Sequence, residues 1–322
     1  MSKPIENNMS TTLPEGILGS KSKTVNKRKK GTLKAYLYLL PALLLLGIWM
    51  YRPLLSTFNL AFYQWGMVPG TTPVPVGWDN FVRLFSSKDF GISVSNTIFY
   101  TVGLLPFSII IPLFLAVATH NMKGKMKNVY RAFFFIPLIL APVSVGAIWR
   151  WLFHPSNGLV NIMLVKLGVI EKNIAFFSDP LFAKWLVLLI TGWKMIGFST
   201  IMFSAALTGI SKDYYEAVSL DGANTLQQFK DITLPLLSPM ILFMVTMSIL
   251  FSSQWSFAYI DILTAGGPFG TSTNIYYEMY KYGFSNLDVG MGSAAAVLFF
   301  IVFAFIALAL NMLSKKYAFY DN

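Results

Sequence analysis

The chain has 322 residues, of which 55% are hydrophobic, 16% aromatic and only 12% charged. A soluble domain of this length has too little interior for so much apolar surface, so the composition predicts an integral membrane protein. It has no cysteine and two histidines, which excludes disulfides and thiolate metal sites and leaves no metal site based on histidine clusters. The net charge of +11 is compatible with nucleic-acid binding, but the charges flank apolar runs, so we expect no nucleic-acid partner.

Residues 1–34 are polar and end in a basic run. This run comprises Lys21, Lys23, Lys27, Arg28, Lys29, Lys30 and Lys34. Basic residues beside a first membrane span are held in the cytoplasm, so we interpret 1–34 as a disordered cytoplasmic arm that sets the orientation. The apolar run that follows is too long for a signal peptide, and no small-residue cleavage site follows it.

Six stretches are apolar enough to span a bilayer, which takes about twenty residues at 1.5 Å rise per residue. They predict an all-α membrane domain over residues 35–318, with spans at 35–62, 94–120, 129–153, 183–209, 236–262 and 291–314. Lys and Arg number sixteen on the side that holds the first arm and eight on the other. This twofold bias predicts that both termini and the connection 211–235 are cytoplasmic.

Two longer connections fall on the outer side, at residues 65–88 and 154–179. The first contains Gly66, Pro69, Gly70, Pro73, Pro75 and Gly77, which predicts a structured loop without regular helix. Prolines also lie inside predicted spans, where they are expected to kink the helices: Pro41, Pro106, Pro112, Pro137 and Pro142.

The connection 211–235 is too polar for lipid and too apolar for a free linker. Ser211 is a suitable N-cap for a short helix, and Gly222 is suited to end that helix or to let another backbone come close. We therefore expect a short helix outside the bilayer that docks on a protein.

The same connection contains Glu216-Ala217-Val218, then Gly222 after three residues, then Ile232-Thr233-Leu234-Pro235 after nine more. This spacing resembles the EAA loop of the permease subunits of binding-protein-dependent ABC importers. Every interval matches, and the one departure is Val218 in place of alanine. The resemblance implies that the ATPase-coupling residues are Glu216, Ala217, Gly222, Ile232, Leu234 and Pro235.

Further motifs extend the resemblance from about residue 35 to the C-terminus. Tyr130-Arg131, Pro137, Trp149, Phe153, Asn157-Gly158 and the segment 257–268 are similar to sugar-type permeases related to the maltose and glycerol-phosphate importers. The resemblance implies a multi-pass protein of the bacterial inner membrane with the type I ABC importer core. It also implies several partners: a second permease subunit, two copies of a cytoplasmic ATPase and an extracytoplasmic substrate-binding protein.

No phosphate-binding loop is present, because Gly19-Ser20-Lys21-Ser22 lacks the glycine before the lysine and any preceding strand. Paired carboxylates and Ser-His-Asp sets are also absent as clusters. We therefore expect no enzymatic activity and no cofactor in this chain, with ATP and Mg²⁺ bound by the partner ATPase.

Lys194 is predicted near the bilayer midplane, where an unpaired charge is costly. Trp193 beside it offers a flat apolar face of the kind on which sugar rings stack. The alternatives are that Lys194 snorkels to the interface or pairs with a carboxylate of another span or subunit.

The fifth predicted span adds Gln254, Trp255, Tyr259 and Asp261 as candidates for the substrate path. Counted along its helix, Gln254 lies in the outer half of the membrane, a height that disagrees with that of Lys194. The alternative role for these polar residues is helix packing.

The predicted substrate is a carbohydrate, most readily an oligosaccharide. If Lys194, Arg150 and Arg52 all faced the path, an acidic saccharide or a glycerol phosphodiester would be favoured, but a neutral sugar stays open.

Two other classes of protein are alternatives to an importer. An ion-driven secondary transporter predicts inverted repeats and buried carboxylates, which we do not find. A membrane scaffold does not explain Lys194.

Overall fold

The computed structural model describes residues 36–120, 122 and 124–317, so the basic arm predicted for residues 1–34 lies outside the described residues. The chain forms two compact units, Met1–Ser56 and Thr57–Asn322. Within the described part of the first unit, residues 36–56 are helical throughout.

Helices dominate the described residues, as the apolar runs predict. Five of them are long and apolar enough to cross a bilayer: Tyr36–Leu60, Lys88–His120, Pro180–Thr208, Ser238–Thr264 and Val289–Lys315. Every boundary lies within six residues of a predicted span. The first span consists of the helical residues 36–46, η1 (Gly47–Tyr51) and α2 (Arg52–Leu60). The others are built, in order, from α4 (Lys88–Leu105), η2 (Pro106–Ile110) and α5 (Ile111–His120); α9 (Pro180–Thr208); α13 (Ser238–Tyr259) and η5 (Ile260–Thr264); and α15 (Val289–Tyr317).

The third predicted span, 129–153, is bent at Pro142, one of the prolines expected to kink a span. It is divided into α6 (Lys125–Ile139) and α7 (Pro142–Leu152), and the pair is bent by 102°. Leu140 and Ala141 between them are extended, with ψ of 133° and 136°. A residue before proline is disfavoured in the helical region, and Pro142 is well suited to begin a new helix, so the Leu-Ala-Pro sequence ends one helix and starts the next.

Proline marks a second irregular place, in the span Lys88–His120. Pro106 opens η2, a turn wider than an α-helical one. Because proline has no N–H, it cannot complete the usual hydrogen bond to the preceding turn, and a wide turn is one way in which a helix accommodates this.

The first outer connection contains a helix that the sequence did not predict. The Gly/Pro-rich part forms the short antiparallel strands β1 (Tyr63–Gln64) and β2 (Val74–Pro75), but residues 79–86 form α3 (Asp79–Ser86). The last glycine of the cluster is Gly77, so the breaker residues do not extend into α3. Asn80, Phe81 and Leu84 share its buried face, which gives the helix its packing energy. The second outer connection contains α8 (Leu159–Lys166) and η3 (Phe176–Ser178).

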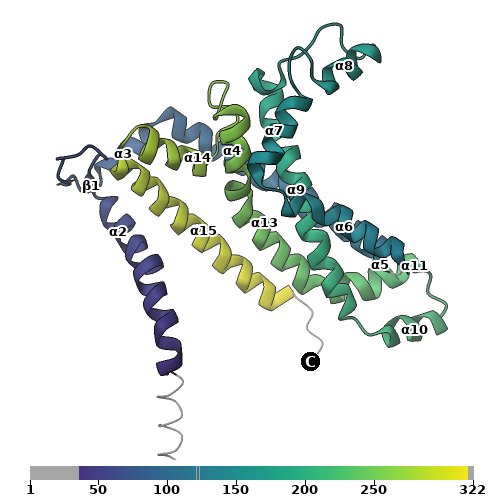
Figure 1. The fold of residues 1–322 in the computed structure, drawn as a ribbon. Helices are drawn as coiled ribbons and strands as arrows, with labels where there is room; N and C mark the ends of the chain where they lie inside the picture. The colour runs from purple at the N-terminus through teal and green to yellow at the C-terminus, as the bar shows by residue number, and fades with distance from the viewer. Residues whose placement is uncertain (1–35, 121, 123, 318–322) are drawn as a thin grey trace, which may run out of the picture. The chain divides into compact units, whose positions relative to one another are not determined.

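The core of the second unit lies where α4, α9 and α13 meet (Figure 1). Tyr100, Val187 and Ile260 are buried together in the largest cluster. Glycines allow this close packing, because Gly103 faces the side chain of Leu188 and Gly192 faces that of Phe107 at distances that leave no room for a Cβ. Small residues are the usual means by which membrane helices approach each other.

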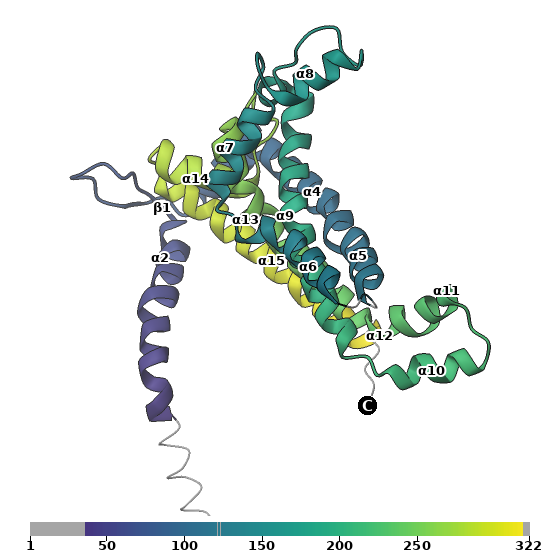
Figure 2. The same cartoon turned by 45° about the vertical axis from the view of Figure 1, so that its right-hand side comes forward.

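The second unit has two ends that differ in what they carry. The elements of residues 211–236, which are α10 (Lys212–Leu220), α11 (Thr225–Gln228), η4 (Phe229–Thr233) and α12 (Leu234–Leu236), lie toward the same end as the C-terminal end of α15 (Figures 1 and 2). We call this the inner end, after the predicted topology. The opposite, outer end carries α3, α7, α8, α14 (Ile275–Tyr280) and η6 (Lys281–Ser285) (Figure 1).

Candidate functional site

The connection at the inner end begins with the predicted helix. The Ser211 hydroxyl caps α10 by accepting a hydrogen bond from the Asp213 N–H at 3.3 Å. Gly222 ends the helix in a left-handed conformation, with φ of +81°. The N–H of Gly222 donates to the Ser219 carbonyl and the N–H of Ala223 donates to the Val218 carbonyl, which is the Schellman pairing. No other atom lies within 4 Å of the position that a Cβ would occupy at Gly222, so the role of this glycine is to end the helix and not to allow a close approach.

The chain then folds back on itself, and α10 and α11 lie side by side (Figure 2). Asn224 and Gln227 form a capping box at the start of α11. Gln228 donates from Nε2 to the Ser219 hydroxyl at 2.9 Å, and the hydroxyls of Tyr215 and Thr233 are 3.0 Å apart. Side-chain bonds therefore hold the two arms of this hairpin together, which a free linker would not need.

The motif residues of this hairpin divide into exposed and packed positions. Glu216 and Ala217 are exposed, whereas Val218 and Ile232 are half-buried. Leu220 is 89% exposed and Leu226 is 74% exposed, so the hairpin also presents apolar side chains to its surroundings. An exposed apolar surface with a carboxylate beside it is typical of a docking site for a protein.

The last two motif residues connect the hairpin to the membrane. Leu234 is 37% exposed, and Pro235 lies in the first turn of α12. Directly afterwards Leu237 is buried in a cluster with Phe203 of α9 and Met244 of α13. The end of the hairpin is therefore packed against two membrane helices.

The second candidate region is built around Lys194, which is the middle residue of the 29-residue helix α9. Its Nζ lies over the ring of Trp255 on α13, 5.3 Å from the ring centroid. No carboxylate of the described residues lies within 4.0 Å of that nitrogen. The predicted difference in height between Lys194 and Gln254 therefore does not separate Lys194 from Trp255, the residue next to Gln254, since a lysine side chain reaches about 6 Å.

Further aromatic rings pack against Trp255, the ring that Lys194 lies over. Trp255 stacks on Phe251 with a centroid distance of 4.9 Å and an angle of 8° between the rings. Phe198 meets both rings edge-on. On the other side of α9, Trp193 meets Trp149 of α7 edge-on at 6.1 Å. Sequence reasoning missed Phe198 and Phe251, although their spacing of four residues from Lys194 and Trp255 would have placed them on the same helix faces.

The remaining predicted path residues lie in different environments. Gln254 and Asp261 are exposed. Tyr259 is 1% exposed in the core cluster, and its hydroxyl has no hydrogen-bond partner among the described residues. The structure therefore brings Lys194 and Trp255 into contact, with Trp193 and Gln254 adjacent to them only in sequence, and places Tyr259 in the core cluster.

The other cation considered for the path is Arg150, at the outer end of α7. Its guanidinium donates to the backbone carbonyl of Ile262 in η5. Arg150 thus ties α7 to the outer end of the fifth span. Arg52 belongs to the first unit and is not placed relative to this region.

A buried polar group at the outer end was not predicted. The fully buried Asn274 caps α14, accepting from the Tyr277 N–H at 2.8 Å and donating to the Ser253 carbonyl at 2.9 Å. The neighbouring Tyr282 hydroxyl is 3.2 Å from that of Ser87. Burial raises the pKa of Tyr282 to about 12, so its phenol stays protonated and able to donate.

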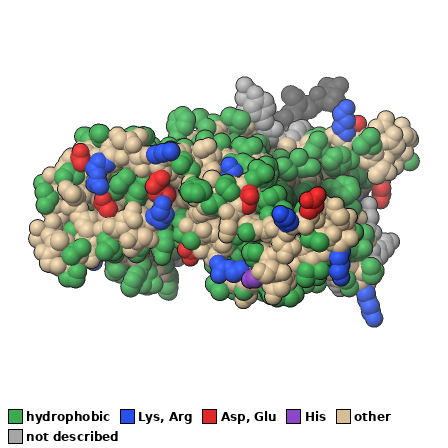
Figure 3. Space-filling model, turned by 90° about the horizontal axis from the view of Figure 1, so that it is seen from above, with side chains coloured by type: hydrophobic (Ala, Val, Ile, Leu, Met, Phe, Trp, Pro, Cys, Tyr) green, Lys and Arg blue, Asp and Glu red, His purple; other side chains and the backbone are tan. Residues whose placement is uncertain are grey.

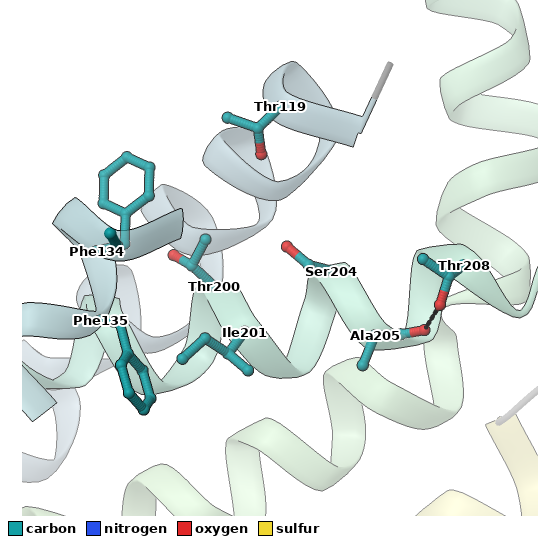
Figure 4. A pocket seen from close by; sticks show the side chains of 9 residues that line it. Thr119, Phe134, Phe135, Thr200, Ile201, Ser204, Ala205 and Thr208 are labelled. Atoms are coloured by element: carbon teal, nitrogen blue, oxygen red, sulfur yellow. Dashed lines mark hydrogen bonds between the residues drawn. The ribbon is translucent and has the colours of Figure 1, made fainter. Parts of the chain in front are cut away.

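An open pocket of about 460 Å³ lies between α5, α6 and α9 toward the inner end (Figure 4). Phe134, Phe135 and Ile201 form its apolar walls. The hydroxyls of Thr119, Thr200 and Thr208 donate to carbonyls of their own helices, as the dashed line from Thr208 to Ala205 in Figure 4 illustrates. Three of the four hydroxyls that line the pocket are already used in this way, so we do not assign a polar ligand to it.

Charged side chains are few and scattered at the outer end. Seen from above, Lys, Arg, Asp and Glu side chains are scattered singly or in small groups among hydrophobic and uncharged ones (Figure 3). Two ion pairs occur among residues 36–120, 122 and 124–317, Arg83 with Asp288 and Lys281 with Glu278. No group of three or more His, Cys, Asp or Glu in these residues is arranged to hold a metal ion.

These observations define the class: a multi-pass helical membrane protein with a folded, exposed hairpin at one end and a cation among aromatic rings at mid-span. Residues 93–317 match the family described as binding-protein-dependent transport system inner membrane component. The chain belongs to this family. It is the permease component of an ABC transporter in the inner membrane and not itself the ATPase, as the sequence predicts.

Individual relatives agree with this placement. The chain is 31% identical over 227 residues to the sn-glycerol-3-phosphate transport system permease protein UgpA of Yersinia pestis, covering 70% of this chain and 76% of the relative. It resembles a chain of a bacterial ABC transporter that imports the acidic polysaccharide alginate, with 26% identity, a TM-score of 0.79 and coverage of 91% and 99%. In a second structure, of the alginate transporter with a periplasmic protein carrying an alginate pentasaccharide, the identity is 26%, the TM-score 0.78 and the coverage 90% and 96%.

Proposed function

We propose that this protein forms part of the translocation path for an oligosaccharide in a binding-protein-dependent importer. The proposal rests on two contacts: Lys194 lies over the ring of Trp255, and Trp255 stacks on Phe251. Flat aromatic faces stack against the C–H faces of sugar rings, and an ammonium donates hydrogen bonds to hydroxyl or acidic oxygens. The similarity to the alginate transporter supports a carbohydrate of several units.

The path residues of this proposal are Trp193, Lys194, Gln254, Trp255, Tyr259 and Asp261. Lys194 contacts Trp255, Trp193 and Gln254 are their neighbours in sequence, and Asp261 is exposed in η5. Tyr259 is buried, so its contribution is to hold the fifth span in place unless the helices separate during transport.

The hairpin at the inner end is the proposed coupling site. Exposed Glu216 and Ala217 dock on a cytoplasmic ATPase, Gly222 ends the docking helix, and Ile232, Leu234 and Pro235 pass its movement to α13. ATP and Mg²⁺ are bound by two copies of that partner and not by this chain. A second permease subunit and an extracytoplasmic binding protein complete the assembly. ATP binding turns the permease halves from inward-facing to outward-facing while the binding protein releases its ligand. This cycle requires that ATP and the liganded binding protein stabilise one state relative to the other.

The experiment is ATP-dependent uptake in proteoliposomes by the complex of this protein with its partner permease, ATPase and binding-protein subunits. The probes are neutral and acidic oligosaccharides. We expect ATPase stimulation and uptake with one of them, and loss of both in Glu216→Ala. An Asp213→Asn variant, which changes another exposed carboxylate of α10, is the matched control. Uptake that ignores ATP and follows an ion gradient would refute the proposal.

A second candidate substrate is a glycerol phosphate, favoured by the similarity to UgpA. It differs from an oligosaccharide in size and needs no stacking surface for several rings. Including sn-glycerol-3-phosphate among the probes separates the two, because a permease of this second type is stimulated by that compound and by none of the oligosaccharides.

A further inference from the structure

We propose that Lys194 selects substrates that carry an anionic group, a carboxylate or a phosphate, and that Trp255 holds its ammonium while the permease is empty. This inference rests on the proposed function, because it assigns a charge to the substrate of the same path. It goes further in naming one residue as the source of selectivity.

The position of Lys194 leaves few ways to stabilise its charge. Fourteen residues of α9 separate it from either end, which is about 21 Å of helix. A lysine side chain of about 6 Å cannot reach the bilayer surface from there, so snorkelling does not explain it. A cation at this depth requires a partner or a water-filled path.

The described residues of this chain supply only one partner, the Trp255 ring at 5.3 Å. A cation–π contact is weaker than a hydrogen-bonded pair with an anion, so an arriving carboxylate or phosphate has an advantage over the ring. The ring still keeps the ammonium in a defined place, since Trp255 is itself fixed by stacking on Phe251.

Two other cations near this region are already engaged. The Arg150 guanidinium donates to the Ile262 carbonyl. Lys184, on the outer part of α9, donates to the Asn96 side chain at 3.4 Å and lies 4.4 Å from the Phe99 ring centroid. Lys184 therefore makes the same type of aromatic contact as Lys194 but also has an amide acceptor, which makes it a matched control.

The test uses the complete complex in proteoliposomes with liganded binding protein in excess. The probes are an oligoalginate, maltotetraose and sn-glycerol-3-phosphate, and the variants are Lys194→Met, Lys194→Gln, Lys194→Arg and Lys184→Met. We expect uptake of an anionic probe, lowered by about 10- to 100-fold in Lys194→Met and Lys194→Gln, because a hydrogen-bonded charge is lost. Lys194→Arg should restore most of the rate, and Lys184→Met should leave it unchanged.

The outcomes separate this inference from the proposed function. Uptake of maltotetraose that is equal in wild type and Lys194→Met would keep the oligosaccharide importer and refute the selection of anions. If Lys194→Met no longer purifies with the second permease subunit but Lys194→Arg does, then Lys194 pairs with that subunit. This result also refutes the selection of anions. No uptake of any probe would refute both. Preference for oligoalginate or for glycerol phosphate identifies the source of the anion.

Discussion

Gly197 of α9 lies directly against the backbone carbonyl oxygen of Phe134 on α6, so closely that any Cβ at position 197 would collide with it. A backbone carbonyl cannot rotate away as a flexible side chain can. This contact attaches α6, the inner half of the third span, to α9. The outer half, α7, packs instead on α13 and η5, where Gly146 faces the side chain of Ile262. The two halves of one span therefore have different neighbours.

Replacement of Gly197 by alanine is expected to destabilise the protein. The added methyl group forces α6 and α9 apart, and overpacking of this kind costs about 1–3 kcal/mol. The measurement is the thermal unfolding temperature of the purified complex in detergent. Gly91 of α4 is the control, since nothing lies within 4 Å of a Cβ there and alanine favours helix. Equal stability of the two variants would show that α6 and α9 are not in contact.

The spans could be predicted because each is a long apolar run whose length is set by the bilayer. A kink at Pro142 was expected, but its angle was not, because proline is tolerated in membrane helices and only the packing of α7 on the outer half of the fifth span fixes the angle. Helix α3 was missed because the preceding glycines and prolines dominated the prediction. Its amphipathic pattern becomes visible only when residues 79–86 are considered alone.

The two candidate sites also differed in predictability. The hairpin at the inner end is local in sequence, so the Ser211 cap and the Gly222 stop could be predicted from the residue types and their spacing, and both are confirmed. The contact between Lys194 and Trp255 joins residues on different helices whose relative height depends on tilt. Asn274 was missed because a single asparagine in an outer connection has no sequence signal for burial.

The conformation of Gly222 predicts how its replacement affects the uptake per ATP hydrolysed. Its φ of +81° is unfavourable for residues with a Cβ, by about 1–2 kcal/mol. Gly222→Val should loosen the end of α10 and reduce uptake per ATP hydrolysed, whereas Gly222→Asn, which tolerates this conformation, should be close to wild type. The ratio of transport to ATPase rate is the measurement. Equal ratios in both variants would mean that the helix stop is not needed for coupling.

Asn274 and Asn224 allow a comparison of two helix caps. Asn224 caps α11 on the exposed hairpin, and its replacement by alanine should cost about 1 kcal/mol and act locally. Asn274 is fully buried and donates to both Ser253 and Ser256 in addition to its cap. Asn274→Ala leaves buried groups without partners, so we expect a loss of about 2–4 kcal/mol and a clearly lower unfolding temperature. A larger loss for Asn224→Ala would contradict the buried network.

The bend between α6 and α7 can be measured directly because the chain has no cysteine. Spin labels at Val129→Cys and Trp151→Cys lie on exposed positions of the two helices. A straight helix would separate these backbone positions by about 33 Å at 1.5 Å per residue, and a bend of 102° reduces this to about 21 Å. Double electron–electron resonance on the complex should therefore give the shorter distance. Labels at Leu181 and Ile201, both on α9, are the control and should give about 30 Å. A single distance near 33 Å for the first pair would show that the third span is straight. A distance distribution that shifts when ATP is bound would identify Leu140-Ala141-Pro142 as a hinge that moves during transport.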